Sequence, residues 1–299
     1  MKRSILRWVI CALLLCGMAL TISSPGLAEV TPLPLDQTVP GNPAKPEGWV
    51  NEEEYEDESI HVTTEHSNVG KVKTSIVRVK IADPSQIRTA MSKDKYDDKT
   101  YVKATAMAKH VNAIAAVNGD FFKYFYKIGY VVRQGEFYRD SLNGERDVLV
   151  IDDHGDFYGV RNAKSEDMET FKQSVLPEGR TIVNTFTLGP VLVENGEVQE
   201  ITTREFQYRY KMQRVCIVQT GELEYAIVEC DGRADATSGM TLANFAEYVK
   251  ELFPDCRLAY NLDGGGSTNV IVNNKRIHKN SDARNISDIL YFASAAAED

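Results

Sequence analysis

Residues 241–274, "TLANFAEYVKELFPDCRLAYNLDGGGSTNVIVNN", carry one helix signal and two strand signals in immediate succession. Thr241 is a typical helix N-cap, apolar residues recur at helical spacing over 242–253, and Pro254 is a stop signal. The segments "RLAYNL" and "VIVNN" are short and apolar, which predicts strands on both sides of three consecutive glycines. This stretch therefore predicts a helix packed on a sheet and a glycine-rich loop between two strands.

Strand patterns dominate the chain on either side of this stretch. "SIHVTTEHS" and "VKTSIVRVKI" alternate and are rich in β-branched residues, whereas "YVKATAMAKHV" has helical spacing and leads into the buried strand "NAIAAV". A short helix is expected over 165–174, with Ser165 as its cap. Hairpins are expected over 213–230 and with turns at Gln134-Gly135, His154-Gly155 and Asn195-Gly196. We expect a single α+β domain: a mixed, mainly antiparallel β-sheet core with two or three packed helices.

The N-terminal 28 residues have the organisation of a secretory signal peptide. Three basic residues precede an apolar run over 8–22, and small residues end at Ala28 as a cleavage site requires. The alternative is an uncleaved N-terminal anchor, because residues 5–22 are nearly long enough to span a bilayer. Both alternatives predict a secreted or extracytoplasmic protein.

Residues 29–58 have the composition of a linker. Five prolines fall between Pro32 and Pro46, and six carboxylates fall between Glu52 and Glu58. Such a segment is expected to be extended and solvated. The folded domain is therefore expected over 59–299.

The charge balance limits the partners of the chain. The formal net charge is -9, and removal of residues 1–28, with three basic and no acidic side chains, makes it -12. An acidic protein lacks the basic footprint that nucleic acids require, and it is repelled by anionic membranes. Small solutes or glycans are the expected partners, and the sequence carries no signal for an oligomeric state.

The cysteines do not form a disulfide scaffold. Cys11 and Cys16 lie in the signal segment, which leaves Cys216, Cys230 and Cys256. Cys216 and Cys230 lie on the two strands of one predicted hairpin and are the candidate pair, although two buried thiols fit the sequence equally well.

Two classes of hydrolase are disfavoured by missing motifs. The five histidines show no metal-ligand spacing, and no Gly-x-Ser-x-Gly nucleophile motif is present. A zinc hydrolase and a serine hydrolase therefore do not fit.

The glycine-rich loop is the first candidate site. Gly264, Gly265 and Gly266 lie between Asp263 and the hydroxyls of Ser267 and Thr268. Without Cβ atoms the backbone amides can converge on an anion such as phosphate, although a tight turn with no ligand is the simpler alternative. The loop lacks the Walker ending and the dinucleotide spacing. We interpret it as an anion cradle with a carboxylate at its edge.

A second candidate site follows the predicted strand "NAIAAV". Asn118 and Asp120 come at its end, and Phe121 and Phe122 come next. Polar groups beside aromatic rings are suited to bind and stack on a sugar, although a strand-ending turn with core aromatics is the alternative. Arg214 opens an apolar strand, Asp231 ends the paired strand, and Arg284 precedes the last strand; each is a further candidate.

Several segments together resemble the phosphodiester glycosidase family, named for an N-acetylglucosamine-1-phosphodiester α-N-acetylglucosaminidase. They are "AVNGDFF", "TLGPVLVENGEV", "QRVCIV", "DGRADATSGMTLANFAEYV", "NLDGGGSTNVIVNN" and "ARNISDIL", within residues 101–292. The resemblance implies a secreted bacterial hydrolase that releases free sugar and a phosphomonoester from a sugar-1-phosphodiester. The positions carried over are Asn118, Asp120, Arg214, Asp231, Asn261, Asp263, Gly264, Gly265, Gly266, Ser267, Thr268 and Arg284.

Three positions depart from the family pattern. Asp120 stands where many members have a small residue, Gln213 where proline is usual, and Asn269 where threonine is more usual. They lie beside the predicted pocket and therefore bear on sugar specificity. Cell-envelope polymers, exopolysaccharides and host glycans all fit the implied substrate class.

A mechanism follows from the residue types. A departing phosphomonoester needs charge stabilisation, which the glycine loop, Arg214 and Arg284 would supply. Asp263 would stabilise the anomeric centre or activate water, with Asp231 or Asp120 as the alternative base. These carboxylates would also suit a divalent cation such as calcium or magnesium.

Two other functions fit the same residues. One is a non-catalytic carbohydrate-binding or exopolysaccharide and cell-envelope assembly protein, and the other is a phosphodiesterase that cleaves the P–O bond.

Overall fold

The structure is a computed structural model of the 299-residue chain. It describes residues 30–35, 39–96, 100–121, 128–201, 206–232, 238–278 and 283–297. The predicted signal segment lies outside these residues. In the part of the chain that the structure describes, no helix has the length and apolar character needed to cross a membrane.

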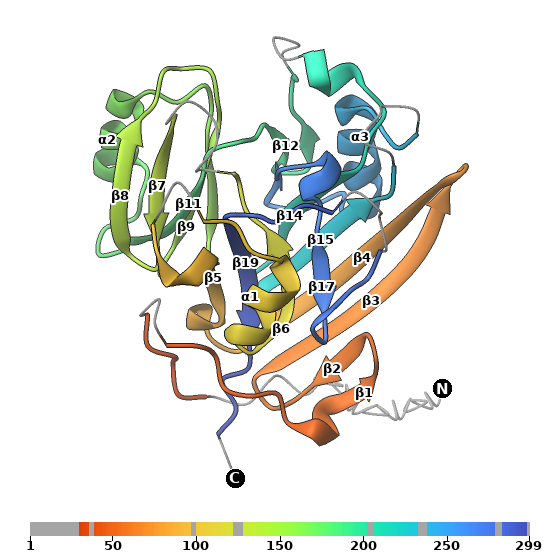
Figure 1. Cartoon of the computed structure of the whole chain (residues 1–299). Coiled ribbons are helices and arrows are strands. Elements are labelled where there is room, and N and C mark those ends of the chain that lie inside the picture. The colour runs from red at the N-terminus through yellow and green to blue at the C-terminus, as the bar shows by residue number, and fades with distance from the viewer. Residues whose placement is uncertain are drawn as a thin grey trace, which may run out of the picture.

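A nine-stranded sheet forms one layer of the fold (Figure 1). Its strand order is β1-β2-β3-β4-β15-β14-β16-β12-β13. The strands are β1 (Trp49–Asn51), β2 (Glu54–Glu56), β3 (Ile60–Val69), β4 (Val72–Ile81), β15 (Glu224–Cys230), β14 (Arg214–Gly221), β16 (Leu258–Asn261), β12 (Val191–Glu194) and β13 (Glu197–Val198).

A five-stranded sheet forms the second layer. Its order is β18-β17-β6-β19-β5. The strands are β18 (Lys275–Arg276), β17 (Val270–Val272), β6 (Ala113–Asn118), β19 (Asp288–Ala293) and β5 (Ile87–Met91).

Two smaller sheets and three helices complete the described fold. The sheets are β10 (Phe157–Val160), β9 (Val148–Asp152) and β11 (Ile182–Phe186), and the pair β7 (Gly129–Arg133) and β8 (Glu136–Ser141). The helices are α1 (Ala104–His110), α2 (Ser165–Ser174) and α3 (Leu242–Leu252). The strand pairs between these elements are antiparallel, as in β14–β15 and β6–β19. The α+β prediction is confirmed.

Successive side chains of one strand enter hydrophobic cores on opposite faces of the sheet. On β4, Val77 and Val79 enter the main core with Leu290 and Phe292 of the facing sheet, whereas Ile76 joins a second cluster that contains Phe245 of α3. Because successive strand residues point to opposite faces, the large sheet is covered by the main core on one side and by α3 on the other. The five-stranded sheet is covered in the same way by α1.

Local sequence signals predict several of the observed helix and strand ends. Thr241 is the N-cap of α3, and its side chain accepts a hydrogen bond from the Asn244 amide at 3.2 Å. Gln134, Gly135, Asn195 and Gly196 have positive φ angles of 50°, 78°, 49° and 72°, as expected for two-residue hairpin turns. Helix α2 starts at Ser165, so its N-cap is Lys164 and not the predicted serine.

The expected linker is not detached from the domain. Strands β1 and β2 extend the nine-stranded sheet, and Tyr55 is fully buried in the main core. Its hydroxyl donates to Asp57 and accepts from the Lys45 amide. Although residues 52–58 are mostly acidic, the buried Tyr55 among them packs this segment against the domain.

Cys216, Cys230 and Cys256 are buried free thiols. Cys216 lies opposite Val228 in the β14–β15 hairpin, and Cys230 lies opposite Arg214, so the two candidate cysteines are out of register. Burial raises the pKa of Cys230 to about 12 and that of Cys256 to about 11.

Candidate functional site

Asn118 connects the end of β6 to the glycine-rich loop. Its Nδ2 donates to the Asp263 carbonyl at 2.8 Å, and its Oδ1 accepts from the Asn269 amide at 2.9 Å. The Asp263 amide in turn donates to the Gly119 carbonyl at 3.4 Å. The structure therefore brings the two predicted sites together, with Asn118 holding both ends of the loop.

Gly119 allows β6 and β19 to meet closely beside the site. Its amide donates to the Asp288 carbonyl at 3.0 Å. A Cβ atom at this position would lie 2.3 Å from Asp288 Oδ1, which real Cβ contacts do not show. Only glycine fits here.

The glycine-rich loop folds as a 3₁₀ turn over Gly265–Ser267. Gly265 has a φ of 58°, and a Cβ on Gly264 would lie 2.8 Å from the Gln213 carbonyl oxygen. The amides of Gly265, Ser267 and Thr268 donate to the carbonyls of Gln213, Gly264 and Gly265. These three amides are therefore occupied in this conformation, which differs from the anion cradle predicted from the sequence.

Side chains at the loop offer further polar groups. The side-chain oxygens of Gln213, Asn261 and Thr268 are buried and make no hydrogen bond within the described part of the chain. Buried polar atoms without partners are costly in a folded protein, by about 1–3 kcal/mol each. In native proteins such atoms bind an ordered water or a ligand, so this region offers polar groups to either.

Asp263 lies at the start of the loop and is partly exposed. Burial raises the pKa of its carboxyl to about 6, with Asp120 adding to the rise. The Ser267 hydroxyl and the positive charges of Arg284 and Arg146 act in the opposite direction. Asp263 is therefore a carboxyl group that changes its charge near neutral pH, between two cations.

Asp120, whose charge acts on Asp263, belongs to a buried triad. Arg133 donates from one nitrogen to Asp120 at 3.0 Å and to Asp288 at 2.7 Å, and all three side chains are at most 1% exposed. The second oxygen of Asp120 accepts from the Thr187 amide at 2.6 Å. Both oxygens of Asp120 are therefore occupied. Burial raises the pKa of Asp288, with Arg133 opposing and Asp120 adding to the rise.

Phe121 and Arg284 lie on the same side of the loop. The Arg284 guanidinium carbon lies 5.7 Å from the centre of the Phe121 ring, and the Arg284 amide donates to the Gly266 carbonyl at 3.0 Å. This arrangement presents a cation and an aromatic face together. The predicted Phe122 lies outside the described residues.

Arg214 and Asp231 make other contacts. Arg214 donates to the carbonyls of Met240 at 3.2 Å and Tyr210 at 2.9 Å, and burial lowers its pKa to about 10. Asp231 accepts from the Gly232 amide at 2.7 Å. These contacts do not join either side chain to Asp263, so their roles in a shared site remain predictions.

Two arginines of the site were not predicted. Arg133 occupies a fully buried strand, and Arg146 precedes the buried strand β9. A basic residue inside or next to an apolar run was the available signal, because such a charge must find a partner. Asp288 lies on β19, far from Arg133 in the sequence, whereas Asp120 and Asp263 lie in the loops that follow β6 and β16.

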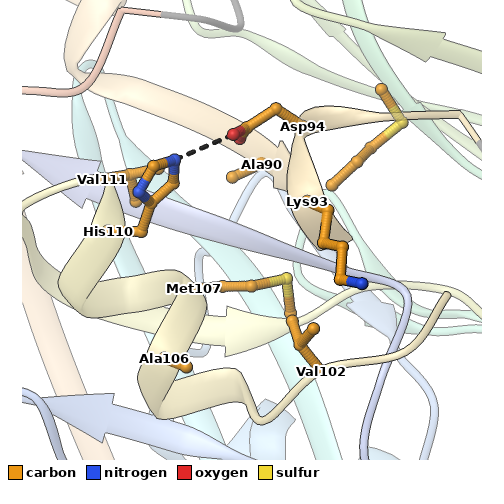
Figure 2. Close-up of a pocket in the computed structure, with 9 residues that line it drawn as sticks. Ala90, Lys93, Asp94, Val102, Ala106, Met107, His110 and Val111 are labelled. Atoms are coloured by element: carbon orange, nitrogen blue, oxygen red, sulfur yellow. Dashed lines mark hydrogen bonds and ion pairs between the residues drawn. The ribbon is translucent and has the colours of Figure 1, made fainter.

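The structure contains a separate pocket of about 260 Å³ between α1 and β5. Figure 2 shows its lining, which includes Met107, Val102 and Ala90. His110 and Asp94 also line it, and His110 Nε2 lies 2.9 Å from Asp94 Oδ2. None of the predicted site residues lines this pocket. It is distinct from the glycine loop.

The cation site at the aspartates stays a prediction. Within the described ranges, no group of three or more His, Cys, Asp or Glu side chains is arranged to hold a metal ion. Asp120 has both oxygens occupied by protein donors.

A comparison with protein families matches the part of the chain that holds these residues. The sequence model of the phosphodiester glycosidase family matches residues 111–293, which include every described site residue named above. Among curated proteins, none matches the chain.

Two solved structures share the fold. The catalytic domain of zebrafish N-acetylglucosamine-1-phosphodiester α-N-acetylglucosaminidase, auto-inhibited by its pro-peptide, is 17% identical, with a TM-score of 0.63. The match covers 86% of this chain and 87% of that chain. A hypothetical protein from Synechocystis is 15% identical with a TM-score of 0.53, over 78% of this chain and 62% of that chain.

Proposed function

Because this chain belongs to the phosphodiester glycosidase family, we propose that it hydrolyses a sugar-1-phosphodiester at the anomeric C–O bond. The products are a free sugar and a phosphomonoester. The enzyme class, a hydrolase of the phosphodiester glycosidase type, follows from the family; the bond and the substrate are the proposal.

The observation that carries the proposal is the environment of Asp263. Burial raises the pKa of its carboxyl to about 6, and the Ser267 hydroxyl, Arg284 and Arg146 are near enough to lower it in part. A carboxylate with a pKa close to the working pH is suited to act as a general base. Asp263 would remove a proton from the attacking water or stabilise positive charge at the anomeric carbon.

The leaving group explains why one such carboxylate suffices. A phosphomonoester has a second pKa of about 6, so it departs as an anion without a strong general acid. It requires charge stabilisation, for which guanidinium groups and hydroxyl donors are suited. Arg284, with Ser267 and Thr268, is positioned at the loop to do this. Arg214 is the sequence candidate whose observed contacts favour this role least.

The sugar would bind on the Phe121 side. Its ring lies beneath the Arg284 guanidinium, and Asn261 Oδ1 and Gln213 Oε1 are buried acceptors that sugar hydroxyls can satisfy. Asp120 acts through its charge, because both of its oxygens are held by protein donors. Asn118 positions the loop through its two backbone contacts.

The partner and location follow from the same proposal. We expect a glycan or sugar-phosphate substrate encountered outside the cytoplasm. A divalent cation is not required by the proposed roles.

The test is product analysis with a panel of α- and β-linked glycosyl-1-phosphate monoalkyl esters. We expect equal amounts of free sugar and alkyl phosphate. Ser267→Ala should lower kcat by about 10²-fold, since one hydrogen bond to developing charge is lost. Ligand binding with no product from any ester would instead support the non-catalytic alternative.

A further inference from the structure

Four hydrogen bonds join five side chains in a continuous chain. Glu53 Oε2 and His66 Nε2 are 2.7 Å apart, and His66 Nδ1 and Ser75 Oγ are 2.7 Å apart. Ser75 Oγ and His278 Nε2 are 3.0 Å apart, as are His278 Nδ1 and Glu229 Oε1. Both nitrogens of both rings are therefore occupied.

Strand register places these residues together. Ser75 on β4 lies directly opposite His66 on β3 and directly opposite Glu229 on β15. His278 follows β18 of the other sheet and contacts Ser75 and Glu229, so that the two imidazole centroids are 6.1 Å apart. The chain thus crosses three strands and joins the two sheets.

The number of protons shared by these five hydrogen-bonded side chains is limited by the bonds they make. Each outer ring nitrogen faces a glutamate oxygen and must carry a proton to donate when that carboxylate is ionised. The Ser75 hydroxyl has one proton and lies between the two inner nitrogens, so it can donate to only one of them. All four hydrogen bonds form only when the other inner nitrogen is also protonated. In that arrangement, with both glutamates ionised, the pair of rings holds one positive charge.

That charge can occupy either ring. With His278 charged, its Nε2 donates to Ser75, and Ser75 donates to His66 Nδ1. Transfer of the Nε2 proton to Ser75 Oγ, with release of the hydroxyl proton to His66 Nδ1, moves the charge to His66. The number of protons and the total charge are unchanged.

The two ends of this hydrogen-bonded chain of side chains differ in solvent exposure. The His66 and Glu53 side chains are 46% and 38% exposed, whereas His278 and Glu229 are 13% and 2% exposed. Glu229 Oε2 is buried and has no hydrogen-bond partner within the residues described. The chain runs from solvent to a buried oxygen that can accept a proton.

Arg276 connects the buried end to the glycine loop. The NH2 nitrogen of Arg276 lies 3.4 Å from the Thr268 carbonyl oxygen. The negative charge of Glu229 opposes the lowering of the Arg276 pKa by burial. The other charges that face His278 are Asp231 and Lys73. Burial opposes the charged form of His278, but the hydrogen bond and charge of Glu229 outweigh it, so its pKa is raised.

We propose that His66, Ser75 and His278 form a proton relay that connects solvent at Glu53 with the buried carboxyl of Glu229. The relay moves one positive charge between the solvent-exposed ring of His66 and the ring of His278, which joins the two sheets, without a change in the number of protons.

The test needs no substrate. The Cε1–H NMR resonances of both rings are followed across pH, with assignments from His66→Gln and His278→Gln. We expect each resonance to move at both protonation steps, because the two rings share one charge through Ser75. In Ser75→Ala each ring should respond at its own single step. Independent single-step curves in the unmodified protein would overturn the relay.

Thr74→Val is the matched control. It also removes a buried hydroxyl, but one on the opposite face that contacts the Tyr248 hydroxyl at 2.9 Å. Its titration should match that of the unmodified protein. Coupling that persists in Ser75→Ala would also contradict the proposal.

Discussion

Replacement of Asp263 by asparagine should remove activity and increase stability. Burial raises the pKa of this carboxyl from 3.8 to about 6, so the folded protein disfavours its ionised form. Each pKa unit corresponds to about 1.4 kcal/mol, so the ionised side chain costs at most about 3 kcal/mol above pH 6. Because the side chain is partly exposed and the neutral amide no longer attracts the two nearby cations, we expect a gain of about 1–2 kcal/mol at pH 7.

The pH dependence has a defined sign. The folded state holds the Asp263 proton more tightly than the unfolded chain between pH 4 and 6. The stability contribution of this group is therefore present at low pH and is lost as the pH rises through this window. Asp263→Asn removes this loss, so its advantage should appear at pH 7 and vanish at pH 4.

Thermal unfolding at pH 4 and pH 7, together with turnover, measures both effects. A gain of about 1–2 kcal/mol raises Tm by roughly 2–8 °C in a domain of this size. Turnover should fall by about 10²–10⁴-fold, as expected for a general base. Asp255→Asn, at an exposed position, is the control and should change neither property. A destabilised Asp263→Asn at pH 7, or one that keeps its activity within a few-fold, would refute the reasoning.

Three further predictions concern the same region. The pH profile of kcat/KM should rise through a pKa of about 6, because Asp263 must be ionised to act as a base; a rate that falls with pH over this range would indicate an acid role instead. Gly119→Ala should destabilise the fold by more than about 2 kcal/mol in denaturant unfolding, because its Cβ would lie 2.3 Å from Asp288. Gly70→Ala, where a Cβ would have no atom within 4 Å, is the control and should cost about 1 kcal/mol. Equal losses of stability in the two variants would contradict the close approach of Asp288 to Gly119. Exhaustive chelation should leave turnover within about two-fold, because the oxygens of Asp120 are held by protein donors; restoration of lost activity by calcium or magnesium would show that the cation is needed.

Features governed by local sequence were predictable. The N-cap of α3 and the hairpin turns at Gln134 and Asn195 depend on a few adjacent residues, and the structure agrees with them. The contact of Asn118 with the Asp263 carbonyl is consistent with the position of both segments at the ends of buried strands.

Features governed by long-range register were not predictable. The contacts of Arg133 with Asp120 and Asp288 join three separated segments, and the row of His66, Ser75 and Glu229 exists only because three strands pair in one register. A shift of one residue would turn each of these side chains to the other face. The amides of the glycine loop were assigned to an anion because composition does not reveal that a 3₁₀ turn uses three of them.

Hydrolysis in water enriched in heavy oxygen tests the central claim most directly. Asp263 and the loop side chains are proposed to direct water to the anomeric carbon, so mass spectrometry should find the label in the released sugar and none in the phosphomonoester. Label in the phosphomonoester would mean cleavage of the P–O bond and would contradict the account.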